Sequence, residues 1–278
     1  MKFSVLLSLA AGGLFAAPAT AHDFWLEPQL YRVNPGAVVT VQAAIGHPGD
    51  AERFAHNPKH FERFMVVGER PAAAAPASAD LVGLAGRLPT GRARLDSGVE
   101  GYVQAAYLSK GSTLTMDAAK FEGYLLGEGL EWVIEERVTR GESAADGTER
   151  YIRCAKALIQ VGTSTDGWDR ALGLPAELTP LTPPHAPRPN PDGSWGFDVR
   201  FDSRGVPTEG LLVEARSILD PEASVAARTD VEGRATFDLP RGGAWYFAAV
   251  EMQRQGDDAA HDWLSHWANL AVELPDLQ

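Results

Sequence analysis

The alternation that begins at Trp195 is the feature that most constrains the fold. Large apolar side chains occupy every second position of the sequence WGFDVRF that starts there. Because successive side chains of a strand point to opposite faces, this pattern predicts a strand with one buried face. Further short strands are predicted at residues 211–216, 234–239, 244–251 and 270–274, with turn residues between them. The segment 193–278 is therefore predicted to form an antiparallel β-sandwich.

A proline-rich segment precedes these strands. Residues 178–192 contain six prolines, and proline fixes its own φ while pushing the preceding residue out of the helical region. This segment is predicted to be a linker between two domains, residues 22–177 and residues 193–278. The first domain is predicted to be β-rich, with a strand at residues 99–108 and one or two short helices. The predicted fold class is therefore mainly β, in two domains.

The clearest helical pattern in the first domain begins near Asp117. Apolar residues follow at spacings i, i+3 and i+4 from Phe121, and Asp117 can cap the first turn. A second helix is predicted over residues 130–140. The Ala- and Pro-rich stretch 71–80 is predicted to be a surface loop, and residues 151–161 are predicted to be either extended or helical.

The first 21 residues have the order of a secretory signal peptide. Lys2 precedes an apolar run from Phe3 to Ala17, and the small residues Ala19-Thr20-Ala21 follow it. The apolar run of about 15 residues is shorter than the ~20 that a membrane-spanning helix needs. We therefore expect export to the periplasm, cleavage after Ala21, and no direct membrane insertion of the mature chain, which would begin at His22.

Charge and motifs argue against several classes of function. The formal net charge of −12 repels phosphate backbones, so nucleic acid is not expected as a partner. Cys154 is the single cysteine of the chain, and its apolar neighbours favour a small buried residue over a reactive thiol. The chain contains no G-x-S-x-G, H-E-x-x-H, Walker or dinucleotide-binding motif. No enzymatic activity is therefore predicted.

A mature N-terminal His22 would be an unusual metal ligand. Its free amine and its nearer ring nitrogen can chelate one ion, an arrangement that suits Cu(II) or Ni(II), and a second histidine would complete a site of three nitrogens. His47 is a candidate for that role, because its turn follows a strand that could pair near the N-terminus. The alternative interpretations are an N-terminal histidine present by accident and a solvated turn residue at His47.

The other histidines give weaker signals. His261 and His266 are five positions apart, which suits neither one helix face nor one strand face, so the two are not expected to share a metal unless the segment is irregular. His56 and His60 are separated by Asn57-Pro58 and are predicted to be solvated.

Several phrases of the mature sequence together resemble a known family. The phrases are residues 22–28, 46–48, 151–153, 156–158, 172–175, 229–230 with Gly233, and 262–267. In this order they resemble a family of bacterial periplasmic proteins of unknown function that is described as the periplasmic component of cobalt or nickel uptake systems and is related to NikM-like nickel-uptake proteins. The resemblance covers nearly the whole mature chain. It implies an all-β protein with an immunoglobulin-like or carboxypeptidase-regulatory-like C-terminal sandwich.

The resemblance also implies a role associated with a metal. His22 and His47 match positions of the family, whereas Glu251 stands where similar sequences tend to have histidine. A carboxylate there would weaken a soft, copper-like site and tolerate a harder ion. The expected ligand is a divalent nickel, cobalt or copper ion, and a membrane metal-uptake transporter is the implied partner. The predicted metal ligands are His22, His47, Glu251, His261 and His266.

Three functions compete at this stage. The first is a periplasmic protein that binds or delivers a divalent transition metal. The second is a copper-dependent oxidase that uses the N-terminal histidine, which would require a flat aromatic surface around the site. The third is a structural or ligand-binding β-sandwich without metal, in which every histidine is incidental.

Overall fold

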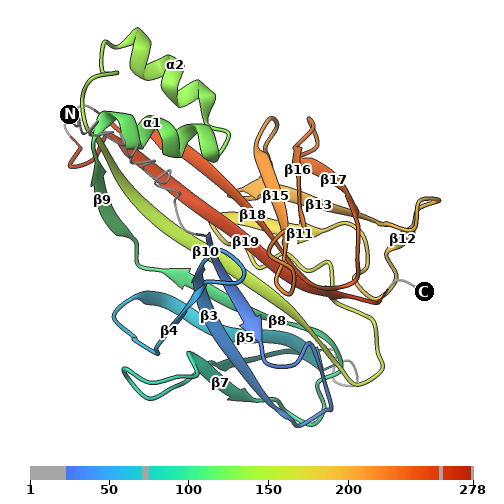
Figure 1. Ribbon diagram of the computed structural model, residues 1–278. Helices are drawn as coiled ribbons and strands as arrows, with labels where there is room; N and C mark the ends of the chain where they lie inside the picture. The colour runs from blue at the N-terminus through green and yellow to red at the C-terminus, as the bar shows by residue number, and fades with distance from the viewer. Residues whose placement is uncertain (1–22, 71–74, 257–258, 277–278) are drawn as a thin grey trace, which may run out of the picture.

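The computed structural model describes residues 23–70, 75–256 and 259–276, and it is mainly β (Figure 1). A ten-stranded sheet forms its centre. In spatial order the strands are β16 (Ser224–Arg228), β15 (Leu212–Ser217), β18 (Gly243–Arg254), β19 (Trp263–Leu274), β10 (Gly147–Val161), β8 (Gly101–Ser109), β5 (Phe61–Arg70) and β6 (Ala75–Asp80), with β2 (Arg32–Val33) and β9 (Ser112–Met116) also paired to β10.

A five-stranded sheet covers one face of this central sheet. Its strands are β11 (Ala176–Pro180), β12 (Arg188–Pro189), β13 (Trp195–Ser203), β14 (Val206–Pro207) and β17 (Arg234–Leu239). Phe197 and Phe247 stack between the two sheets with ring centroids 5.3 Å apart, and both side chains are fully buried. A β-sandwich is therefore present, and its core contains the alternating apolar residues of β13 together with residues of β10 and β11, which precede the predicted boundary at residue 193.

The other face of the central sheet carries a four-stranded sheet. Its strands are β1 (Asp23–Pro28), β3 (Val38–Gly46), β4 (Glu52–Phe54) and β7 (Gly91–Arg94). β1 lies against β10 and β19. The ring of Trp25 on β1 stacks on that of Tyr246 on β18, with centroids 4.7 Å apart and an interplanar angle of 8°. Both rings are fully buried, so this contact joins the start of β1 to the centre of the molecule.

Two helices cover the remainder of that face, at one end of the long strands β10, β18 and β19 (Figure 1). α1 (Ala118–Gly127) begins as predicted, with Asp117 accepting a hydrogen bond from the backbone N–H of Lys120 at 3.1 Å. α2 (Glu131–Thr139) confirms the second helical prediction. Their apolar residues pack on Val250 and Trp263, which places both helices directly over the sheet.

Two local predictions need correction or completion. Residues 75–80 were expected in a surface loop but form β6, which pairs with β5, because a chain of small residues can still supply the backbone hydrogen bonds of a ladder. The ambiguous apolar run at residues 151–161 belongs to the strand β10. The signal peptide prediction falls on residues that lie outside the described part of the chain.

The predicted linker lies between segments that share the central sheet. Its first residues, 178–180, belong to β11, which pairs with β13. β10 lies before the linker and β19 after it, and the two pair in parallel from Glu149↔Trp263 to Ala157↔Ala271. Whether the two segments fold independently stays a prediction. In the described residues, no helix is both long enough and apolar enough to cross a bilayer.

A buried ion pair links β10 to β11. The Nζ atom of Lys156 lies 2.7 Å from Oε1 of Glu177, and both side chains are almost completely buried. The Glu177 carboxylate also accepts backbone N–H groups from Leu172 at 2.7 Å and Gly173 at 2.8 Å. Each buried charge is therefore balanced by the opposite charge, and the carboxylate has further hydrogen-bond donors, as a buried charge requires.

Replacing Lys156 with alanine should destabilise the fold strongly. Lys156→Ala leaves the Glu177 charge without its cation in the interior, so we expect the free energy of unfolding to fall by about 3–5 kcal/mol. Urea denaturation of the purified protein measures this, with the exposed Lys59→Ala as the matched control. A loss for Lys156→Ala no larger than that of the control would contradict the role of the ion pair.

Candidate functional site

The first described residue of β1 and the turn after β3 meet at one place. β1 and β3 pair in antiparallel register, with Asp23 opposite Gly46. Nδ1 of His47 lies 3.9 Å from Oδ2 of Asp23. His22 lies outside the described residues, but it is bonded directly to Asp23. The expectation that the strand before His47 pairs near the N-terminus is therefore confirmed.

Asp23 is a buried carboxylate held by the central sheet. Oη of Tyr246 donates a hydrogen bond to Oδ2 of Asp23 at 2.7 Å, and Nε of Arg216 lies 3.5 Å from the same oxygen. Burial raises the pKa of Asp23, while the Tyr246 hydrogen bond and the Arg216 charge oppose that rise. The carboxylate thus has a fixed position and a marked need for compensating positive charge.

Three carboxylates, among them Asp23, act electrostatically on Glu128 at the end of α1. Burial raises the pKa of Glu128, the residue that caps the C-terminus of α1, well above its usual range, and the charges of Asp23, Glu214 and Glu149 raise it further. Glu214 on β15 is paired with Arg216. We call Asp23, Glu128, Glu149 and Glu214 the N-terminal carboxylate cluster.

Glu149 is the most deeply buried member of this cluster. Its side chain is 0 % exposed. Oε1 accepts hydrogen bonds from the hydroxyl groups of Tyr124, at 3.2 Å, and Ser265. Oε2 has no hydrogen-bond partner among the described residues. Burial raises the pKa of Glu149, and the hydrogen bonds from Ser265 and Tyr124 oppose that rise.

The described residues do not by themselves form a metal centre. No group of three His, Cys, Asp or Glu side chains within residues 23–70, 75–256 and 259–276 is arranged to hold one ion. Asp23 and His47 supply two donor groups that face each other. A metal bound at this place would therefore need donors from His22 as well.

Glu251 and His266 form a second pair on the opposite face of the central sheet. They stand directly opposite each other on β18 and β19. Tyr246 faces β1, and Glu251, five positions further along the same strand, points the other way. Oε1 of Glu251 lies 3.5 Å from Nη1 of Arg204. Burial lowers the pKa of His266, and the Glu251 charge opposes this effect.

The five predicted ligands therefore do not form a single site. His47 lies with Asp23 on one face of the sheet, while Glu251 and His266 lie on the other. His261 is in the bend before β19, outside the strand that carries His266. The sheet separates the two groups, because side chains of one strand alternate between its faces.

Sequence reasoning missed two features of the structure. Glu128 and Glu149 gave no signal, because they lie on separate elements that only the tertiary fold brings together. His56, predicted to be solvated, is instead buried, with Nδ1 2.7 Å from the backbone oxygen of Thr90. The prediction for His56 was wrong because the loop that carries it folds back against β7.

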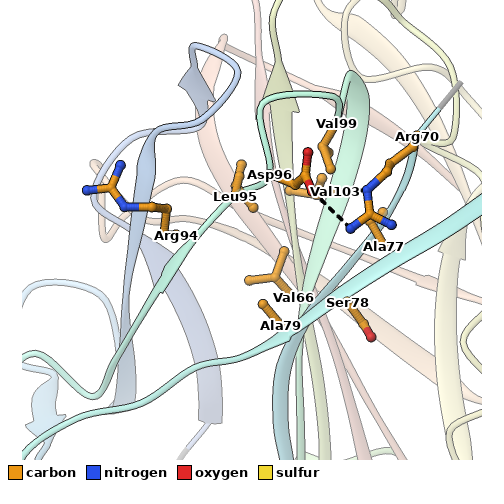
Figure 2. A pocket seen from close by; sticks show the side chains of 11 residues that line it. Val66, Arg70, Ala77, Ser78, Ala79, Arg94, Leu95, Asp96, Val99 and Val103 are labelled. Atoms are coloured by element: carbon orange, nitrogen blue, oxygen red, sulfur yellow. Dashed lines mark hydrogen bonds and ion pairs between the residues drawn. The ribbon is translucent and has the colours of Figure 1, made fainter. Parts of the chain in front are cut away.

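A separate cavity of about 350 Å³ lies between β5, β8 and the loop after β7. Its walls are polar and apolar in about equal parts, and Figure 2 shows Arg70 and Asp96 facing each other at its edge. Nη2 of Arg70 lies 3.0 Å from Oδ2 of Asp96. None of the predicted metal ligands lines this cavity.

A family model supports the first part of the resemblance. The model described as "Domain of unknown function (DUF4198)" matches residues 19–253. The chain belongs to this family. A search of curated proteins found no match to this DUF4198 protein. Among solved structures it is similar to the D0-D1 domain of intimin, with 12% identity over 89% of this chain and 97% of that chain and a TM-score of 0.19, a value too low to support any argument.

The hydrogen bond from Tyr246 to Asp23 should be important for stability. Tyr246→Phe removes the donor from a buried carboxylate, so we expect the free energy of unfolding to fall by about 1–3 kcal/mol. Tyr31→Phe is the matched control, because the buried Tyr31 hydroxyl has no hydrogen-bond partner among the described residues, and its removal should cost nothing. Equal losses in denaturant unfolding of the two variants would contradict this assignment.

Proposed function

We propose that this DUF4198 protein binds a divalent transition metal, nickel, cobalt or copper, in the periplasm, using the N-terminal histidine of its mature chain together with His47. The observation that carries the proposal is the contact of His47 with Asp23, 3.9 Å apart at the start of β1. That contact fixes a second imidazole beside the residue to which His22 is bonded.

The register of β1 and β3 supports this arrangement. The ladder pairs Phe24 with Ile45 and Asp23 with Gly46. One further pair in the same register would bring residue 22 opposite His47. Directly opposed residues of an antiparallel pair have Cβ atoms about 4.5–5.5 Å apart, which is within reach of two side chains that share one ion.

The donor set explains the choice of metal. An amine and two imidazoles are nitrogen donors that suit Cu(II) and Ni(II), and the Asp23 carboxylate can add one oxygen that a harder ion accepts. The Tyr246 hydrogen bond holds this carboxylate in place, as second-layer groups do for metal ligands. The resemblance to uptake proteins supports delivery to a membrane metal-uptake transporter as the role of the bound ion.

Calorimetric titration with Cu(II), Ni(II) and Co(II) tests the proposal on four proteins. These are the mature chain, the same chain with Ala21 retained, His47→Ala, and His60→Ala as a control at an exposed histidine. Retaining Ala21 converts the amine of His22 into an amide, so affinity should fall on the order of 100-fold or more, while His47→Ala should cost about 10- to 100-fold. His60→Ala should leave the affinity unchanged.

Metal binding by the mature chain should weaken as the solution becomes more acidic. Metal ligands must lose their protons, so the affinity of the mature chain should fall steeply as the pH drops below about 6. Equal affinities for all four proteins would contradict the proposal. The Glu251–His266 pair would then be the next site to examine.

A further inference from the structure

Arg153 on β10 is held between two aromatic rings. Its guanidinium carbon lies 5.1 Å from the centroid of the Phe24 ring and 4.9 Å from that of the Tyr151 ring. Both separations suit a cation–π contact, which reaches to about 6 Å. Phe24 is buried and packs in turn on Tyr107, with ring centroids 4.9 Å apart. The rings therefore fix the position of the guanidinium group, which is partly buried beside β1.

This guanidinium group lacks a counter-ion in the described part of the chain. It forms no ion pair there, and its Nε atom is buried without a hydrogen-bond partner. Burial lowers the pKa of Arg153, and the hydroxyl groups of Tyr151 and Tyr107 oppose this effect. Arginine stays protonated in proteins, so the group keeps a full positive charge that a neutral hydroxyl cannot balance. A charge removed from water without a counter-ion is costly, so an anion is expected to bind beside it.

Two other arginines show how such a group is usually satisfied. Each also lies over an aromatic ring. Nη2 of Arg137 donates hydrogen bonds to the backbone oxygens of Glu142, at 2.9 Å, and Ala145, at 2.6 Å. Arg254 pairs with the Glu142 carboxylate at 2.8 Å. Arg153 differs from both, because it has the rings without a carboxylate or carbonyl partner among the described residues.

The chemistry of this position favours a small organic carboxylate. The planar guanidinium group presents N–H donors that match the two oxygens of a carboxylate. A dianion such as phosphate is less favourable, because the net charge of the protein is −12 and repels a dianion more than a monoanion. Tyr151 is partly exposed and offers its ring to the body of an organic ligand. A monoanion with an apolar or aromatic body therefore fits best.

We propose that Arg153 binds the carboxylate group of a small organic monoanion, with the body of the ligand packed beside Tyr151. The bound carboxylate supplies the counter-ion that the described chain does not provide, and the rings of Phe24 and Tyr151 hold the guanidinium group in position to receive it. This site goes beyond the proposed metal site, because it uses neither an imidazole nor a metal ion.

Nuclear magnetic resonance titration with sodium benzoate tests the proposal on the purified protein in metal-free buffer. The Nε–H signal of Arg153, identified by its absence in Arg153→Lys, should shift and saturate as benzoate is added. Acetate should bind more weakly, since it has no ring to pack beside Tyr151, and uncharged methyl benzoate should leave the signal in place. Inorganic phosphate at the same ionic strength should bind at least about 3-fold more weakly than benzoate.

Three variants separate a binding role of Arg153 from a structural one. Arg153→Lys keeps a positive charge but cannot donate to both carboxylate oxygens in one plane, so benzoate affinity, followed through backbone amide signals that also report the fold, should fall at least about 10-fold. Arg150→Lys, at an exposed position of the same strand, should keep the affinity. His47→Ala should also keep it, which distinguishes this test from the metal titration.

Four results would each overturn the proposal. They are the absence of a saturable shift with benzoate, equal benzoate affinities of Arg153→Lys and the unmodified protein, tighter binding of phosphate than of benzoate, and loss of benzoate binding in His47→Ala.

Discussion

The placement of β1 across the central sheet is the constraint on which the rest of the structure depends. Trp25 stacks on Tyr246, and the hydroxyl of Tyr246 holds Asp23, so one side chain of β18 fixes both the apolar and the polar part of β1. The stack buries two large rings, and the hydrogen bond satisfies a carboxylate that burial would otherwise penalise. Together they fix the position of Asp23 and Trp25 at the start of β1.

This placement brings together parts of the chain that are distant in sequence. Asp23 comes from β1, Glu128 from the end of α1, Glu149 from β10 and Glu214 from β15. The resulting concentration of negative charge lies on the face that β1 shares with the helices, and the sandwich core lies on the other face. The fold therefore separates a polar site from a dry core by the thickness of one sheet.

Local features of the structure could be predicted well from the sequence. The alternation in β13 and the Asp117 cap of α1 are properties of a few neighbouring residues, and both elements lie where the pattern placed them. Features that depend on distant partners could not be found. The Ala-rich β6 has no amphipathic pattern, and it is a strand only because its backbone pairs with β5. The parallel pairing of β10 with β19 joins segments that are distant in sequence, so no local pattern predicts it.

The residues of the candidate site also differ in whether a local sequence pattern could predict them. His47 could be selected because a single turn follows a strand that pairs near the N-terminus. Glu149 resembles a solvated strand residue in the sequence, and only its contacts with Tyr124 of α1 and Ser265 of β19 reveal its burial. The pairing of Glu251 with His266 depends on the register of β18 and β19, which no short motif determines.

The central claim is that a cation site lies at the N-terminus of the mature chain. The most direct test is electron paramagnetic resonance of the mature protein loaded with one equivalent of Cu(II). Selective ¹⁵N labelling of histidine should change the nitrogen hyperfine pattern in the way expected for the amine and ring of His22 and the ring of His47. The same labelling in a chain that retains Ala21 should give a different spectrum. Identical spectra from the mature chain and the chain that retains Ala21 would contradict the account. A spectrum of the mature chain that shows no coupling of copper to protein nitrogen atoms would also contradict it.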